Sequence, residues 1–89
     1  MDKIELLNSA KHWTEEVLFT EEIWYENHKP SVRKLAKIID RSKSWVDKSL
    51  RLAIGLRIYP NLKEQKTRHS AYRYVLLKKR KKHEHINSR

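Results

Sequence analysis

A group of polar side chains recurs between positions 43 and 51 at the spacing of one exposed helix face. Its members are a hydroxyl, a carboxylate and long cationic side chains, which can hydrogen-bond to base edges and to phosphate oxygens. These side chains can act together only if one helix presents them on the same face. The apolar residues around them must therefore be spaced so that this helix forms. The group is Lys43, Ser44, Asp47, Lys48 and Arg51.

Two short helices joined by a tight turn are predicted over residues 31–52. The first begins at Ser31, a good N-cap that directly follows Pro30. Asp40 and Arg41 interrupt the apolar pattern, and Ser42 offers a second N-cap. A helix of about two turns, a break of about three residues and a second capped helix is the helix-turn-helix pattern. The apolar positions at helical spacing are Val32, Leu35, Ala36 and Ile39 before the break, and Val46, Leu50 and Ala53 after it.

This stretch resembles the helix-turn-helix of ParB-type plasmid and chromosome partition proteins. That family has a Leu-Ala pair, a small turn residue, a basic residue, a Ser-Arg or Ser-Lys pair and a helix of the form V…L-R-L. The turn position that is usually glycine is Asp40 here, and aspartate tolerates the left-handed conformation better than most residues. The resemblance implies a DNA-binding element, whereas the family's nucleotide-binding N-terminal domain is not expected in 89 residues. The matching residues are Leu35-Ala36, Arg41, Ser42-Lys43, Val46 and Leu50-Arg51-Leu52.

The charge of the chain is divided between its two ends. Its net charge is +10, yet residues 1–30 carry seven acidic and only three basic side chains. Residues 31–77 carry twelve basic and three acidic side chains, so the excess begins where the predicted helix pair begins. This asymmetry is typical of a polyanion-binding face with an acidic back, and a generic solubility charge is the alternative.

An all-α domain is predicted over residues 1–77, because the chain has 38% hydrophobic residues and one glycine. One helix is expected from Asp2 to about Leu18, and another from Thr20 to about Asn27. The second helix of the central pair should continue to about Ile58, where Pro60 ends it. Trp13, Phe19 and Trp24 are expected in the core, with an exposed dimer face as the alternative.

The C-terminal part is predicted to be a last helix that begins after Ser70 and docks on the core. A basic tail follows over residues 78–89, with a frayed end after residue 82. Five successive bases suggest contact with phosphates; a nuclear-import signal has the same composition, and a solvated helix end is the alternative. The docking residues would be Ala71, Tyr72, Val75 and Leu76, and the bases are Lys78, Lys79, Arg80, Lys81 and Lys82.

Other chemistries find little support in the sequence. Cysteine is absent, which excludes disulfides and thiolate metal sites. The His83 and His85 pair has no third ligand near it in sequence, and no catalytic motif or membrane span is evident. We therefore expect no enzyme activity, catalytic residue, metal, cofactor, small-molecule substrate or membrane contact.

The sequence thus predicts an all-α protein that binds double-stranded DNA with the helix after Ser42 in a major groove. Phosphates would be held by Arg33, Lys34, Arg41 and the tail, and Trp45 should be partly buried, with a sugar or thymine-methyl contact as the alternative. A transcriptional regulator, or a plasmid or phage partition or replication accessory factor, would use such binding. It would lie in the cytoplasm with the nucleoid, or in the nucleus of a eukaryotic host. The alternatives are a module that docks on a polymerase or replication factor, and an RNA-binding protein; a homodimer is left open.

Overall fold

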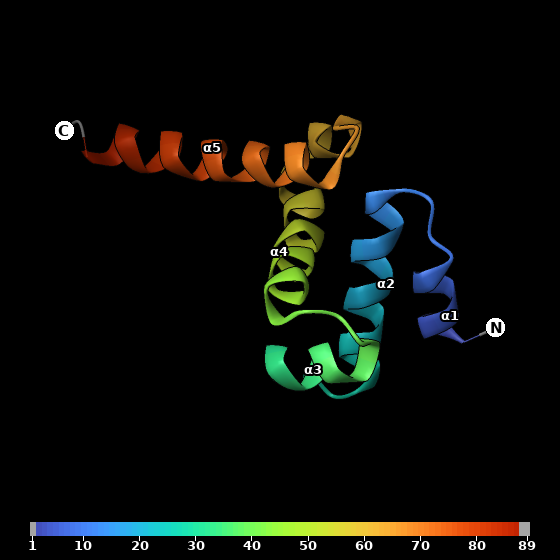
Figure 1. Ribbon diagram of the computed structural model, residues 1–89. Helices are drawn as coiled ribbons and strands as arrows, with labels where there is room; N and C mark the ends of the chain where they lie inside the picture. Colours follow the sequence, from blue (N-terminus) through green and yellow to red (C-terminus); the bar gives the residue numbers. More distant parts are fainter. Residues whose placement is uncertain (1, 88–89) are drawn as a thin grey trace.

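A computed structural model describes the backbone of residues 2–87 and the side chains of residues 2–79. In that part of the chain there is no strand, which confirms the prediction of an all-α domain. Helices α2 and α4 lie side by side, α1 packs on α2, and α3 packs on the N-terminal end of α4. Helix α5 crosses α4 and extends away from the other helices (Figure 1). The elements are α1 (Lys3–Asn8), α2 (Trp13–Glu26), α3 (Val32–Ile39), α4 (Lys43–Ile58), the 3₁₀ helix η1 (Pro60–Glu64) and α5 (Arg68–Asn87).

The N-terminal helices break at a different place from the predicted one. Helix α1 ends at Asn8, and α2 begins after His12, whose Nδ1 accepts a hydrogen bond from the Thr14 backbone N–H at 3.2 Å. Thr20 was predicted to start a helix, but it is buried within α2. Its hydroxyl donates to the Glu16 carbonyl at 2.7 Å, so the side chain is satisfied by its own helix and marks no helix start.

Two hydrophobic clusters form the core. Trp13 is buried, and Phe19 and Trp24 are partly buried, as expected for core residues. Between α2 and α4, the buried carboxylate of Glu21 accepts a hydrogen bond from Arg57 Nη1 at 2.7 Å. The cluster at the α3 end contains Leu7, Ile23, Leu35, Ala36, Ile39 and Val46, and the one at the α5 end contains Trp13, Val17, Leu52, Ala53, Leu62, Ala71 and Val75.

The last helix departs from the prediction at its start and in its packing. It begins at Arg68, and the Thr67 hydroxyl accepts a hydrogen bond from the Ser70 backbone N–H at 3.1 Å, so Ser70 is not the cap. Leu76 was predicted to dock but is 46% exposed, because Ala71 and Val75 form the face that contacts the core. The backbone helix continues to Asn87, past the predicted helix end. Among the described residues, no helix combines the length and apolar character of a membrane span.

Gly55 lies where α4 approaches both η1 and α5. A Cβ at this position would lie 2.9 Å from Leu62 Cδ2 and 3.1 Å from Val75 Cγ2, and both of those side chains are buried. We expect Gly55→Val to overpack this crossing and to lower the free energy of unfolding by roughly 1–3 kcal/mol, measured by chemical denaturation.

The matched control for this prediction is Gly55→Ala. A single methyl gains about 1 kcal/mol of helix propensity, which offsets part of its steric cost. Alanine should therefore destabilise the protein less than valine does. A valine variant as stable as the wild type would contradict the close approach of these elements.

Candidate nucleic-acid interface

The turn between α3 and α4 is short and capped on both sides. Asp40 adopts the left-handed conformation, with φ 57° and ψ 54°, as predicted for this position. The Arg41 backbone N–H then donates to the Ala36 carbonyl at 3.0 Å, which closes the end of α3. Ser42 Oγ accepts a hydrogen bond from the Trp45 backbone N–H at 3.1 Å and so begins α4, as expected of an N-cap.

The packing of α3 on α4 determines which side chains of α4 face outward. Ile39 and Val46 are buried in the same cluster, on either side of the turn. The opposite face of α4 therefore presents its polar residues, and Asp47 Oδ2 accepts a hydrogen bond from Arg51 Nε at 3.0 Å. The exposed members of the group are Lys43, Ser44, Lys48 and Arg51, while Asp47 is half-buried.

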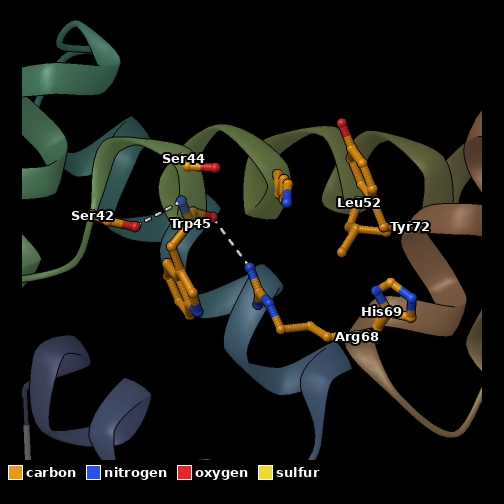
Figure 2. A pocket seen from close by; sticks show the side chains of 8 residues that line it. Ser42, Ser44, Trp45, Leu52, Arg68, His69 and Tyr72 are labelled. Atoms are coloured by element: carbon orange, nitrogen blue, oxygen red, sulfur yellow. Dashed lines mark hydrogen bonds between the residues drawn. The ribbon is translucent and has the colours of Figure 1, made fainter.

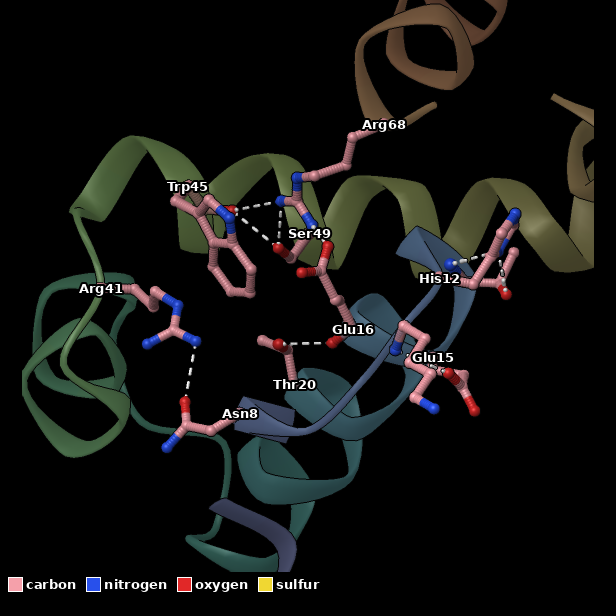
Figure 3. Close-up of polar contacts among 11 residues, drawn as sticks. Asn8, His12, Glu15, Glu16, Thr20, Arg41, Trp45, Ser49 and Arg68 are labelled. Atoms are coloured by element: carbon pink, nitrogen blue, oxygen red, sulfur yellow. Dashed lines mark hydrogen bonds and ion pairs between the residues drawn. The ribbon is translucent and has the colours of Figure 1, made fainter. Parts of the chain in front are cut away.

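The cationic residues expected to hold phosphates lie in different environments. Arg33 and Lys34 are exposed on α3. Arg41 is half-buried, and its Nη2 donates to Asn8 Oδ1 at 2.8 Å, so this side chain is engaged within the fold (Figure 3). The structure therefore brings Arg33 and Lys34, but not Arg41, to the exposed surface of the α3–α4 pair.

Trp45 is partly buried, as predicted, and it lies between two guanidinium groups. The Cζ atom of Arg41 is 5.2 Å from the centre of the ring, and that of Arg68 is 4.1 Å away. These distances are those of cation–π contacts, which link the indole to the α3–α4 turn through Arg41 and to α5 through Arg68. Trp45 is thus a structural element of the surface that carries Lys43 and Ser44.

Arg68 is the residue of this region that sequence reasoning missed. Its side chain is 21% exposed and connects α2, α4 and α5 (Figure 3). Its Nη2 donates to the Trp45 carbonyl at 3.1 Å and to the Ser49 hydroxyl, and its Nη1 lies 3.4 Å from Glu16 Oε1. Burial lowers the pKa of the guanidinium, against the opposing effect of Glu16. No local pattern could have identified this contact, because the partners lie 19 to 52 positions away in sequence.

The predicted basic tail is continuous with α5. Lys78 and Lys79 are exposed, and Lys78 Nζ is 5.4 Å from the centre of the Tyr74 ring. Arg80, Lys81 and Lys82 belong to α5, but their side chains lie outside the described ones, as do those of His83 and His85.

Within the part of the chain that the structure describes, no group of three or more potential metal ligands is gathered. Comparisons of this chain with protein-family models, with curated proteins and with solved structures find no match.

Proposed function

We propose that this protein binds double-stranded DNA through α3 and α4, used as a helix-turn-helix with the N-terminal half of α4 in the major groove. The proposal depends on one observation. The capped turn leaves Lys43, Ser44 and Lys48 exposed together on α4, while Ile39 and Val46 are buried between the helices. Hydroxyl and ammonium groups on a rigid helix are suited to donate hydrogen bonds to base edges.

Contacts to the DNA backbone would come from residues that flank this helix. Arg33 and Lys34 are exposed on α3, directly before the turn. Lys78 and Lys79 are exposed on α5, which extends away from the domain. These side chains would hold phosphates and fix the orientation of α4, without reading sequence. Such occupancy of a DNA site would serve a transcriptional regulator, or a partition or replication accessory factor of a plasmid or phage.

A protein-docking role is the second candidate, and one observation favours it. Ile54 and Ile58 are 52% and 59% exposed, one turn apart on the C-terminal half of α4. Apolar side chains on an exposed helix face are typical of a contact with another protein. A polymerase, a replication factor or a second copy of this chain could cover them.

Selection of bound duplexes from a random pool tests the proposal at physiological salt. A defined consensus is the expected result, and a palindromic one would indicate that a dimer binds two half-sites. If no preferred sequence is recovered, and the affinity for duplex DNA is no greater than that of a generic basic protein, the protein-docking role becomes the better explanation.

The basic tail provides a separate prediction. Deleting residues 78–89 should weaken specific and non-specific duplexes by a similar factor, because side chains that bind phosphates read no base. The slope of log affinity against log salt should become shallower by roughly 0.9 for each phosphate that the tail neutralises in the wild type. The measurement is a binding titration at several salt concentrations.

A matched variant separates charge from helix length. Replacing Lys78, Lys79, Arg80, Lys81 and Lys82 by glutamine keeps the chain length and removes the charge. It should reproduce the effect of the deletion if phosphate binding is the cause. Parallel salt plots for the wild type and both variants would rule out this role for the tail.

A further inference from the structure

A groove of about 330 Å³ runs between the N-terminal half of α4 and the first turns of α5 (Figure 2). It lies directly beside the proposed DNA-reading residues, because Ser44 and Lys48 line it. On the α5 side its wall is formed by His69 and Tyr72. The complete lining is Ser42, Ser44, Trp45, Lys48, Leu52, Arg68, His69 and Tyr72.

The chemistry of this lining favours an anion. It contains two cationic side chains, three hydroxyl groups and an imidazole, and no carboxylate is among the lining residues. Lys48 Nζ lies 5.2 Å from the centre of the Tyr72 ring, so its ammonium group is held over the α5 wall of the groove. A phosphate group binds where positive charge and several hydrogen-bond donors lie together.

The donors available to a ligand are those near the opening of the groove. Arg68 already uses Nη2 for the Trp45 carbonyl and the Ser49 hydroxyl, and Nη1 faces Glu16. Ser44 and Lys48, in contrast, are exposed, and His69 and Tyr72 line the groove from the opposite side. The polar atoms of these four residues can therefore approach a group that enters from solvent.

We propose that the groove between α4 and α5 binds one phosphodiester group of the duplex, with the phosphate at His69 and the Tyr72 hydroxyl, while Ser44 and Lys48 on the α4 side face the base edges. The apolar floor at Leu52 and the ring of Tyr72 suit the adjacent deoxyribose. This proposal depends on the proposed DNA-binding function and adds His69 and Tyr72 to its contacts. With α3 holding the backbone through Arg33 and Lys34, this contact from α5 fixes the orientation of α4 in the major groove.

The experiment compares two matched double variants on a duplex obtained by selection. His69→Ala/Tyr72→Phe removes two polar groups from the groove and keeps the Tyr72 ring. The control, Tyr25→Phe/His28→Asn, makes similar changes at two exposed residues of the chain. Asparagine is used at position 28 because His28 has φ 62°, which asparagine tolerates. We expect the groove variant to bind roughly tenfold more weakly, as for a hydrogen bond to a charged group, with an unchanged base preference, and the control to bind normally.

A methylphosphonate scan locates the phosphate involved. Each backbone phosphate is replaced in turn by a neutral methylphosphonate, and binding by the wild type and the groove variant is compared. One position should weaken the wild type strongly and the groove variant little. Titration of the free protein with inorganic phosphate, monitored by the NMR shifts of His69, tests whether the groove binds free phosphate instead of a phosphate of DNA.

The outcomes distinguish failure of this inference from failure of the proposed function. If no duplex is bound at all, both proposals are wrong. If DNA is bound but the groove variant behaves as the wild type at every phosphate, the groove does not hold the backbone. Tight binding of inorganic phosphate, without any position-specific methylphosphonate effect, would assign the groove to a small phosphate and would also overturn the inference.

Discussion

Replacing Lys43, Ser44 and Lys48 together by alanine is expected to weaken binding to a selected duplex by at least about 100-fold, which is about 3 kcal/mol. Removing a side chain that reads a base should cost roughly 1–3 kcal/mol at its own base pair, so preference at those positions should relax as well. The measurement is fluorescence anisotropy with the selected duplex and with single-substitution duplexes. Fold stability should not fall, because all three residues are exposed and alanine has the highest helix propensity.

The matched control removes the same positive charge from elsewhere in the chain. Lys11 and Lys63 are exposed and lie outside α4. Lys11→Ala/Lys63→Ala should therefore weaken all duplexes slightly and equally, through long-range electrostatics alone. If the triple variant kept both the affinity and the preference of the wild type, α4 would not be the reader. The docking role at Ile54 and Ile58 would then be the better explanation.

The elements around the turn could be predicted because their signals are local. Ser31 and Ser42 each accept a hydrogen bond from a backbone N–H three positions ahead, so a cap is visible as a serine before a periodic segment. Asp40 can be identified as the left-handed residue because few side chains tolerate that conformation. Leu35 and Val46 are buried, as their spacing indicates.

The other features depend on contacts that no local pattern contains. Histidine is an unusual N-cap, so the start of α2 at His12 is not visible within an apolar pattern that continues through Ala10 and Trp13. In the sequence, Gly55 indicates only a residue of low helix propensity, yet in the structure it permits the close packing of Leu62 and Val75 against α4. The groove between α4 and α5 likewise exists only because α5 crosses α4.

Arg68→Ala is expected to lower the free energy of unfolding by about 2–3 kcal/mol. The substitution removes the cation stacked at 4.1 Å on the Trp45 ring, and it leaves Glu16, whose side chain is 30% exposed, without its ion-pair partner. The Ser49 hydroxyl still donates to the Trp45 carbonyl at 2.8 Å, so no buried donor is stranded there. The destabilisation should therefore come from the unpaired Glu16 carboxylate and the uncovered indole. Chemical denaturation measures it.

The pKa of Arg68 indicates which of its interactions stabilise the fold. Burial lowers that pKa, so the folded protein holds the proton of Arg68 less tightly than the unfolded chain does. The charged guanidinium therefore opposes folding at pH values below its folded-state pKa. Arg68 must therefore stabilise the fold through packing on Trp45 and through its hydrogen-bonding partners, and not through its charge alone.

This reasoning predicts that removing both charges costs less than removing one. In the double variant Glu16→Gln/Arg68→Met, methionine keeps an apolar stem over Trp45 and no carboxylate is left unpaired. Its stability should lie within about 1 kcal/mol of the wild type, since a buried ion pair is often replaceable by uncharged side chains. A double variant as unstable as Arg68→Ala would mean that the hydrogen bonds from Arg68 to Trp45 and Ser49 are essential for the stability of the fold. In that case Arg68 would hold the N-terminal half of α4 in place by its donors, and the DNA affinity of this variant should fall together with its stability.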